Sequence, residues 1–409
     1  MIKPEILSPA GNPESLDYAL AYGADAVYLA GKSFGMRSGA GNFDEEQLSE
    51  ALSKAHAAGV SVYVTCNVIP REYELGDLKA FLERMETSGV DALIVGDLGV
   101  FALAKKYAPS IPLHVSTQTG VANSETANLL YEMGASRVVL ARELSLEEIT
   151  AIRANTPPEL EIEAFVHGSM CVSFSGRCLL SNYLTGRDAN RGDCAQPCRW
   201  KYSLVEETRP GEYFPIAEDE HGTHILNSRD MCMIDHIDKL VKAGITSFKI
   251  EGRAKSSYYA AVVTNAYRCA VDEYARWVEE GSKGTFELSP WIRSEVMTVS
   301  HREYATGFYF GTAPGQVYDN GGYVRDYEVA AVVEEWSDGR VTARQRNKFF
   351  EGDRLEIVRP GQPPAELIAV DLKNDEGESI SSTPHPNMRF SMPCEPELEP
   401  KTILRRRKT

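Results

Sequence analysis

Before residue 255 the sequence repeats one pattern eight times: a short apolar run rich in β-branched residues, a polar or glycine-containing turn, and an amphipathic stretch. The eight runs lie at 5–11, 25–31, 60–67, 91–97, 111–118, 136–143, 161–168 and 246–253. Continuous apolar strands that alternate with helices predict a parallel sheet covered on both faces. Eight such strands predict a (β/α)8 TIM-like barrel. The alternative is an open doubly wound sheet, but no GxGxxG motif follows the first run to support it.

If the chain forms a barrel, the polar residues at the ends of the apolar runs lie at the same end of it. Active sites of such barrels lie at the C-terminal ends of the strands. The polar side chains at those ends are Ser8, Asn67, Asp97, Ser116, Thr117, Gln118, Arg142, Glu143, His167, Glu251 and Arg253. Each one alone is ordinary, because strand ends are where a chain turns polar. Their convergence at one mouth predicts a binding or catalytic site there.

The repeat is interrupted once, between the run that ends near His167 and the run that begins near Thr246. Almost 80 residues, 168–245, replace the usual helix and short loops. Long insertions in compact domains are usually functional. Five of the eight cysteines lie in this one: Cys171, Cys178, Cys194, Cys198 and Cys232. We therefore expect a cysteine-rich insertion before the eighth strand.

The sequence changes character near residue 284, after a last helical pattern at 256–280. Short alternating runs separated by turn residues follow, which predicts a small antiparallel β-barrel domain over 284–409. The barrel with its insertion then occupies 1–283. The basic tail at 404–409 is interpreted as a solvated terminus, with a contact to RNA as the alternative.

No secretory signal and no apolar run of about 18 residues occur, so we expect a cytoplasmic protein without a membrane span. Thiols stay reduced in the cytoplasm, and clustered cysteines there usually bind metal or act in catalysis. The net charge of −16 argues against general attraction to nucleic acid. It leaves room for a local basic surface, for which the insertion offers Arg177, Arg187, Arg191 and Arg199.

The cysteine spacing in the insertion is C-x6-C-x15-C-x3-C-x33-C. Structural zinc sites usually show two close pairs, and only Cys194 and Cys198 form one here. An iron–sulfur cluster accepts irregular spacing, and five cysteines are candidates for its four positions. A Cys–His nucleophile built from His167 and Cys171 is a further possibility, but such a site does not need four neighbouring cysteines. No HExxH helix is present for a zinc peptidase.

Five segments resemble one known family, named peptidase U32 or collagenase-like protease. They are EAFVHGSMCVSFSGRCLLS at 163–181, CRW at 198–200, NSRDMCMID at 227–235, FKIEGR at 248–253 and SHREYATGFYFG at 300–311. The resemblance begins at EILSPAGN near the N-terminus and reaches the C-terminal domain, so it covers nearly the whole chain.

The resemblance implies hydroxylases that carry a 4Fe-4S cluster and act without molecular oxygen, despite the family name. The length and the C-terminal domain look most like the branch that makes 5-hydroxyuridine at the wobble position of tRNA with prephenate. Other relatives hydroxylate ribosomal RNA or a quinone precursor. Carried over position by position, the implied cluster ligands are Cys171, Cys178, Cys194 and Cys232, with Cys198 as the alternative fourth ligand.

Further roles follow for the strand-end residues if the chain acts as this resemblance implies. An anticodon base already lies in a loop, so a pocket can receive it at modest cost. Prephenate is a dicarboxylate, and arginine binds carboxylates in bidentate fashion. Substrate-binding candidates are therefore Arg142, Arg177 and Arg253, with Gln118, unless the arginines pair with Glu143 or Glu251 instead. His167 and Glu251 are candidate acid and base, and Asn67 is the third catalytic candidate.

Two other classes of function remain open at this point. One is a U32-type peptidase, and the other is a zinc-stabilised RNA-binding module. The sequence makes no prediction of the oligomeric state.

Overall fold

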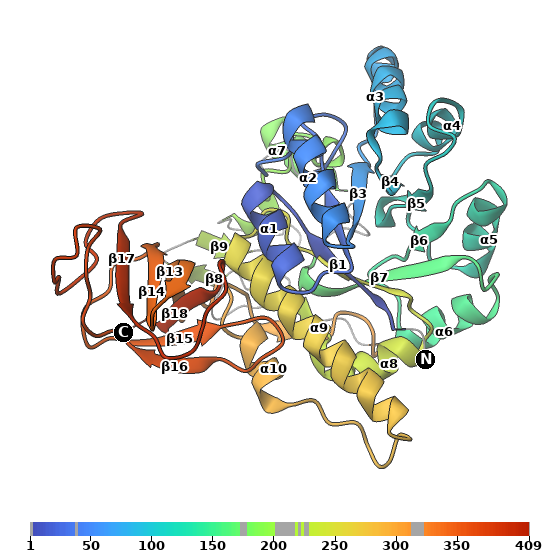
Figure 1. Cartoon of the computed structure of the whole chain (residues 1–409). Coiled ribbons are helices and arrows are strands. Elements are labelled where there is room, and N and C mark those ends of the chain that lie inside the picture. The colour runs from blue at the N-terminus through green and yellow to red at the C-terminus, as the bar shows by residue number, and fades with distance from the viewer. Residues whose placement is uncertain are drawn as a thin grey trace, which may run out of the picture.

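The computed structural model describes residues 3–36, 40–171, 178–200, 217–219, 222–224, 229–311 and 323–408. Its centre is a closed barrel of eight parallel strands surrounded by helices (Figure 1). The strands are β1 (Glu5–Pro9), β2 (Ala26–Leu29), β3 (Ser61–Cys66), β4 (Ala92–Val95), β5 (Leu113–Val115), β6 (Arg137–Val139), β7 (Glu161–Ser169) and β11 (Ser247–Ile250). Each coincides with one of the eight apolar runs. The (β/α)8 prediction is confirmed.

The barrel closes because β11 pairs in parallel with both β1 and β7. Phe248 at the middle of β11 lies opposite Ile6 on one side and Ala164 on the other. Chain segments more than 200 residues apart therefore share one sheet. This closure brings the C-terminal ends of all eight strands to the same mouth.

The helices cover the outside of the barrel, and six of the eight begin at a residue whose side chain caps the first turn. They are α1 (Pro13–Ala21), α2 (Glu45–Ala57), α3 (Leu75–Ser88), α4 (Leu98–Tyr107), α5 (Ser124–Glu132), α6 (Leu146–Ala154), α8 (Ile237–Lys242) and α9 (Ser257–Glu279). Asp44 and Ser145 form capping boxes at the starts of α2 and α6. The outward strand residues and the inner helix faces build one large apolar core.

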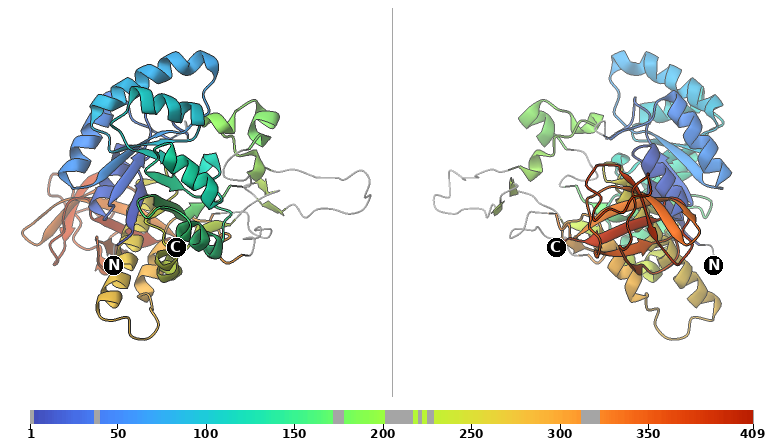
Figure 2. Two further views of the ribbon diagram at one scale, coloured as in Figure 1. Left: turned by 90° about the vertical axis from the view of Figure 1, so that its right-hand side faces the viewer. Right: turned by 60° about the vertical axis from the view of Figure 1, so that its left-hand side comes forward.

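The cysteine-rich insertion lies between β7 and β11, as the sequence predicts. It contains α7 (Leu180–Thr185), short 3-10 turns at Ala189–Arg191 and Pro197–Arg199, and the hairpin of β8 (Ala217–Asp219) and β9 (Gly222–His224). Figure 2 shows α7 standing out from one end of the barrel. The chain returns through β10 (Asp230–Cys232), which pairs antiparallel with the end of β7.

A bidentate ion pair fixes the insertion to the barrel. Both terminal nitrogens of Arg191 lie 2.6 Å from the carboxylate oxygens of Glu74, just before α3. These hydrogen bonds lower the pKa of Glu74 to about 2. This ion pair therefore helps to hold the insertion over the mouth of the barrel.

The C-terminal residues form a six-stranded antiparallel sheet in the order β16-β15-β18-β13-β14-β17. The strands are β13 (Tyr327–Ser337), β14 (Arg340–Gln345), β15 (Arg354–Val358), β16 (Ala365–Ile368), β17 (Arg389–Pro393) and β18 (Ile403–Arg407). The sheet forms a half-barrel, which agrees with the predicted antiparallel β class. Between the two sheets, α10 (Pro290–Val296) packs against α9, and β12 (Tyr304–Ala305) pairs with β10.

The basic tail is not a solvated terminus, so that interpretation was wrong. Residues of the tail form β18, which lies between β15 and β13. Arg405 is buried and pairs with Glu295 of α10, while Arg406 pairs with Glu328 and Asp353. These guanidinium groups are neutralised within the protein. The pair of Arg405 with Glu295 joins the C-terminal sheet to α10, whereas Arg406 pairs within the C-terminal domain. Only the last residues of the tail are exposed.

Among the helices of the described residues, none has both the length and the apolar character needed to cross a bilayer.

Replacing Arg405 by Met should destabilise the protein strongly. Arg405 and Glu295 are each 2% exposed and 2.6 Å apart, so the substitution leaves a buried carboxylate without its cation. Such a change costs about 3–5 kcal/mol. Urea unfolding gives the free energy. Arg354→Met is the control, because the Arg354 side chain is 81% exposed and should change stability by about 0.5 kcal/mol or less. Equal effects of the two substitutions would contradict this role of Arg405.

Candidate active site

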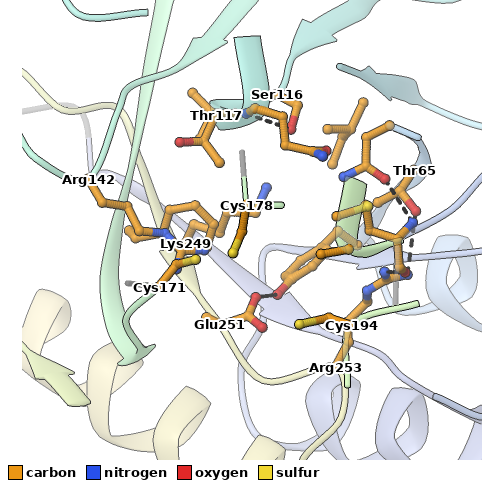
Figure 3. A pocket seen from close by; sticks show the side chains of 18 of the residues that line it. Thr65, Ser116, Thr117, Arg142, Cys171, Cys178, Cys194, Lys249, Glu251 and Arg253 are labelled. Carbon is orange, nitrogen blue, oxygen red and sulfur yellow. Dashed lines mark hydrogen bonds between the residues drawn. The ribbon is translucent and has the colours of Figure 1, made fainter. Parts of the chain in front are cut away.

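A pocket of about 140 Å³ opens at the C-terminal ends of the barrel strands (Figure 3). One wall comes from the strand ends and carries polar side chains, and the other comes from the insertion and carries cysteines. The pocket-lining residues from the strand ends include Thr65, Asn67, Ser116, Thr117, Gln118, Arg142, Lys249, Glu251 and Arg253. Of the eleven polar strand-end residues that were expected to converge, seven line this pocket, and Ser8, Asp97, Glu143 and His167 do not. Ser8 instead forms a hydrogen bond with Thr264 of α9, and Asp97 caps the start of α4.

Most of the candidate residues lie together in this pocket. Asn67, Gln118, Arg142, Glu251 and Arg253 all line it. Two candidates, His167 and Cys232, do not line it. Arg177 lies outside the described residues.

Four cysteines of the insertion, Cys171, Cys178, Cys194 and Cys198, line the pocket. Figure 3 shows the first three on the side of the pocket where Glu251 lies. Backbone N–H groups of Leu180 and Gln196 donate to the sulfurs of Cys178 and Cys194, each at 3.4 Å.

These thiols do not converge on one point. Among the described residues, no three His, Cys, Asp or Glu side chains are arranged to hold a single metal ion. A compact zinc site would need such a group. A cubane cluster is larger, because each thiolate binds a different iron, so thiols spread along a pocket wall suit it better.

Cys232 lies behind the pocket wall, at the end of β10 opposite His167 of β7. Burial raises the pKa of its thiol to about 12, with Ile234 and Tyr267 as hydrogen-bonding neighbours that oppose the shift. The expected ligand Cys232 therefore lies apart from the other three, whereas the alternative, Cys198, lines the pocket with them.

His167 is enclosed by aromatic rings. Its side chain is buried, and its two ring nitrogens lie 3.4 Å from the Tyr267 hydroxyl and 3.2 Å from the Tyr304 hydroxyl. The ring of Tyr259 packs on it as well. Burial lowers the pKa of His167 to about 3, so it is neutral at physiological pH. We do not retain it among the residues that contact substrate.

The two candidate arginines in the pocket differ in their contacts. Arg142 lies 3.8 Å above the ring of Phe165 and donates to the backbone oxygen of Ser169 at 3.0 Å. No carboxylate among the described residues pairs with it, so the expected alternative of a Glu143 pair is not found. Arg253 is buried and donates to the backbone oxygen of Met36 and to Thr65. Arg142 is thus the more available cation.

Lys249 is a site residue that the sequence reasoning missed. Its ammonium lies at the floor of the pocket, 2.5 Å from Glu163 and 4.6 Å from the centre of the Tyr28 ring. An ammonium has three donors, so Lys249 can also bind an oxygen in the pocket. The available signal was a lysine inside the apolar run at 246–253, because a buried lysine requires a specific partner.

Glu251 follows the end of β11 and lines the pocket together with the other strand-end residues. The hydroxyl of Tyr28 donates to the backbone oxygen of Ile250 at 2.9 Å and lies 3.3 Å from Glu251 Oε2. The pocket thus combines one carboxylate, fixed cations, amide side chains and four thiols. This set can bind an anionic or carbonyl-bearing substrate beside a metal centre.

The fold and the pocket define a class of protein: a TIM-like barrel whose cysteine-rich insertion supplies one wall of the active-site mouth. The models of two domains match this chain, Peptidase family U32 over residues 11–318 and its C-terminal domain over 325–405. The chain belongs to the peptidase U32 family.

Named relatives match between two thirds and nearly all of the chain. The tRNA hydroxylation protein P of Escherichia coli K12 is 36% identical, over 98% of this chain and 95% of the relative. The protein of the same name in Haemophilus influenzae is 33% identical, over 88% of this chain and 86% of the relative. The 23S rRNA 5-hydroxycytidine C2501 synthase of Escherichia coli K12 is 39% identical, over 66% of this chain and 39% of the relative.

The buried, neutral His167 should make stability depend on pH. The pKa of His167 in the folded protein, about 3, lies below its ordinary value of about 6.5. Between these two pH values the imidazole is protonated in the unfolded chain but neutral in the folded protein. Stability is therefore lost as pH falls below about 6.5, by about 2 kcal/mol at pH 5. The measurement is urea unfolding of the wild type and of His167→Gln at pH 7 and pH 5. Between these pH values the variant should lose about 2 kcal/mol less of its unfolding free energy than the wild type. His385→Gln, at an exposed position, is the control. An unchanged pH dependence in His167→Gln would refute the assignment.

Proposed function

We propose that this protein is an RNA hydroxylase that makes 5-hydroxyuridine at the wobble position of tRNA, with a 4Fe-4S cluster and prephenate. The proposal rests on one observation: four cysteines and fixed cations line the same barrel pocket. Relatives that span nearly the whole chain and are named tRNA hydroxylation proteins support the choice of tRNA. The ribosomal RNA relative supports the wider class of RNA hydroxylation at C5.

The cysteines of the pocket wall would hold the cluster. The proposed ligands are Cys171, Cys178, Cys194 and Cys198. The backbone N–H groups of Leu180 and Gln196 would hydrogen-bond the bound sulfurs of Cys178 and Cys194. When bound, a cluster with four thiolate ligands supplies electron transfer to the adjacent pocket.

The cations on the opposite wall would bind prephenate. Arg142 has planar donors that suit a carboxylate, and Lys249 supplies a second positive charge at the floor. Asn67 and Gln118 offer amide groups that can hydrogen-bond a uracil edge. Glu251 is the available proton acceptor in the pocket.

The structure gives the peptidase alternative little support. The described residues that line the pocket include no histidine, so none of its cysteines has the partner base that a Cys–His nucleophile needs. We therefore do not propose proteolysis.

The choice of the fourth ligand is tested by comparing Cys198→Ser with Cys232→Ser after anaerobic purification. The first should bind less than half of the wild-type iron, because only three thiolates remain in the pocket wall. The second should keep its iron, because Cys232 lies behind the wall. Iron analysis and the visible absorption band measure both. Loss of iron in Cys232→Ser with retention in Cys198→Ser would contradict the assignment.

The proposed activity is tested in a host strain that lacks its own tRNA hydroxylation genes. Expression of the wild-type chain should restore 5-hydroxyuridine derivatives, measured by mass spectrometry of nucleosides from bulk tRNA. Cys171→Ser should reduce them at least tenfold, whereas Cys269→Ala, on the buried face of α9, should not. Full expression without any 5-hydroxyuridine in tRNA would contradict the proposal, and new hydroxycytidine in ribosomal RNA would redirect it to that substrate.

A further inference from the structure

A second cavity, of about 470 Å³, lies against the same cysteine wall. It shares Arg142, Cys171, Cys194, Cys198 and Glu251 with the active-site pocket. Its remaining wall comes from the start of α9 and from residues near the C-terminal sheet, including Lys255, Ser256, Ser300, Tyr323 and Arg325. A ligand that continues out of the active-site pocket would therefore meet this second cavity.

Two cations of this cavity are held in place by the same serine. Lys255 Nζ donates to the backbone oxygen of Ser300 at 3.4 Å, and Arg325 Nε donates to the Ser300 hydroxyl at 3.3 Å. Both also lie over the ring of Tyr323, at 4.4 Å and 5.5 Å from its centre. Fixed side chains lose little entropy when they bind, so these contacts prepare the two cations for a ligand.

The two cations are not neutralised by carboxylates. Among the described residues, neither Lys255 nor Arg325 forms an ion pair. Lys255 helps to lower the pKa of the Asp230 carboxyl, which itself pairs with buried Arg302 at 2.6 Å. Glu251 also lines this cavity and would repel an anion. An anion bound by Lys255 and Arg325 therefore has to lie on the side of the cavity away from Glu251.

We propose that Lys255 and Arg325 bind a phosphate of the RNA backbone next to the nucleotide in the active-site pocket. The inference rests on the proposed function and specifies how the RNA is held. A chain with a net charge of −16 repels a polyanion as a whole, so binding requires local cations. Most contacts between proteins and nucleic acids go to phosphates, and these contacts set the register of the bound strand. Two fixed cations beside the pocket fit that role.

The test is tRNA binding by the full-length double variant Lys255→Gln/Arg325→Gln, measured by filter binding between 50 and 200 mM salt. We expect roughly tenfold weaker binding at low salt and a salt-dependence slope that is shallower by about 1, as for the loss of one phosphate contact. The charge-preserving variant Lys255→Arg/Arg325→Lys should retain most of the affinity. Thermal melting checks that each variant is folded.

A matched control removes the same charge elsewhere. Lys242 ends α8, at the opposite end of the barrel, and Arg354 lies in the C-terminal sheet, and both are exposed. Lys242→Gln/Arg354→Gln should bind tRNA like wild type. Equal losses in the two double variants would mean that only net charge matters, and would overturn the proposal.

Other results separate this inference from the proposed function. If the Lys255→Gln/Arg325→Gln variant binds tRNA normally while the wild type hydroxylates it, the phosphate site is wrong and the function stands. If the variant binds tRNA normally but needs more prephenate for activity, the cavity binds the small dicarboxylate, which also overturns the proposal. If wild type neither binds nor hydroxylates tRNA, the proposed function itself fails.

Discussion

The carboxylate of Glu163 lies inside the barrel between two cations, and the geometry of the active-site mouth depends on this contact. Glu163 is fully buried, 2.5 Å from Lys249 Nζ and 3.2 Å from Arg137. Arg137 in turn lies 2.6 Å from Glu5. The chain of charges connects β1, β6, β7 and β11, the strands around the closure of the barrel. Removing one member would leave an uncompensated buried charge, which is costly. The network thus fixes the position of the Lys249 ammonium at the pocket floor.

The insertion depends on a close approach where β7 leaves the barrel. Gly168 has a φ of +109°, and a Cβ there would lie 2.4 Å from the backbone oxygen of Glu251. Only glycine permits this turn beside the end of β11. The same strand end then carries the chain to Cys171 at the pocket, while the pair of Arg191 with Glu74 fixes the far side of the insertion. Backbone conformation and one ion pair therefore bring the cysteines to the strand-end residues.

Much of this arrangement could be predicted from residue patterns. Apolar runs mark the strands, because a parallel sheet buries both faces, and the position of each strand end follows from them. The environments of individual side chains could not be predicted in this way. His167 points away from the pocket because the register of β7 against β11 shifts by one residue after Phe165, which moves the next side chains to the other face. Cys232 lies opposite it on β10. The tail forms a central strand because Arg405 finds a buried carboxylate 110 residues earlier, in Glu295. Such contacts depend on the closed tertiary structure and leave no local pattern.

We propose that the target uridine enters the barrel pocket between the cysteine wall and Lys249. The most direct measurement is photocrosslinking of the full-length protein to tRNA that carries 4-thiouridine at the wobble position, followed by peptide mass spectrometry. The account predicts crosslinks to residues that line this pocket, such as Phe165, Gln118 or Leu180, and their loss when unlabelled tRNA competes. Crosslinks confined to the C-terminal sheet, over 327–407, would contradict it.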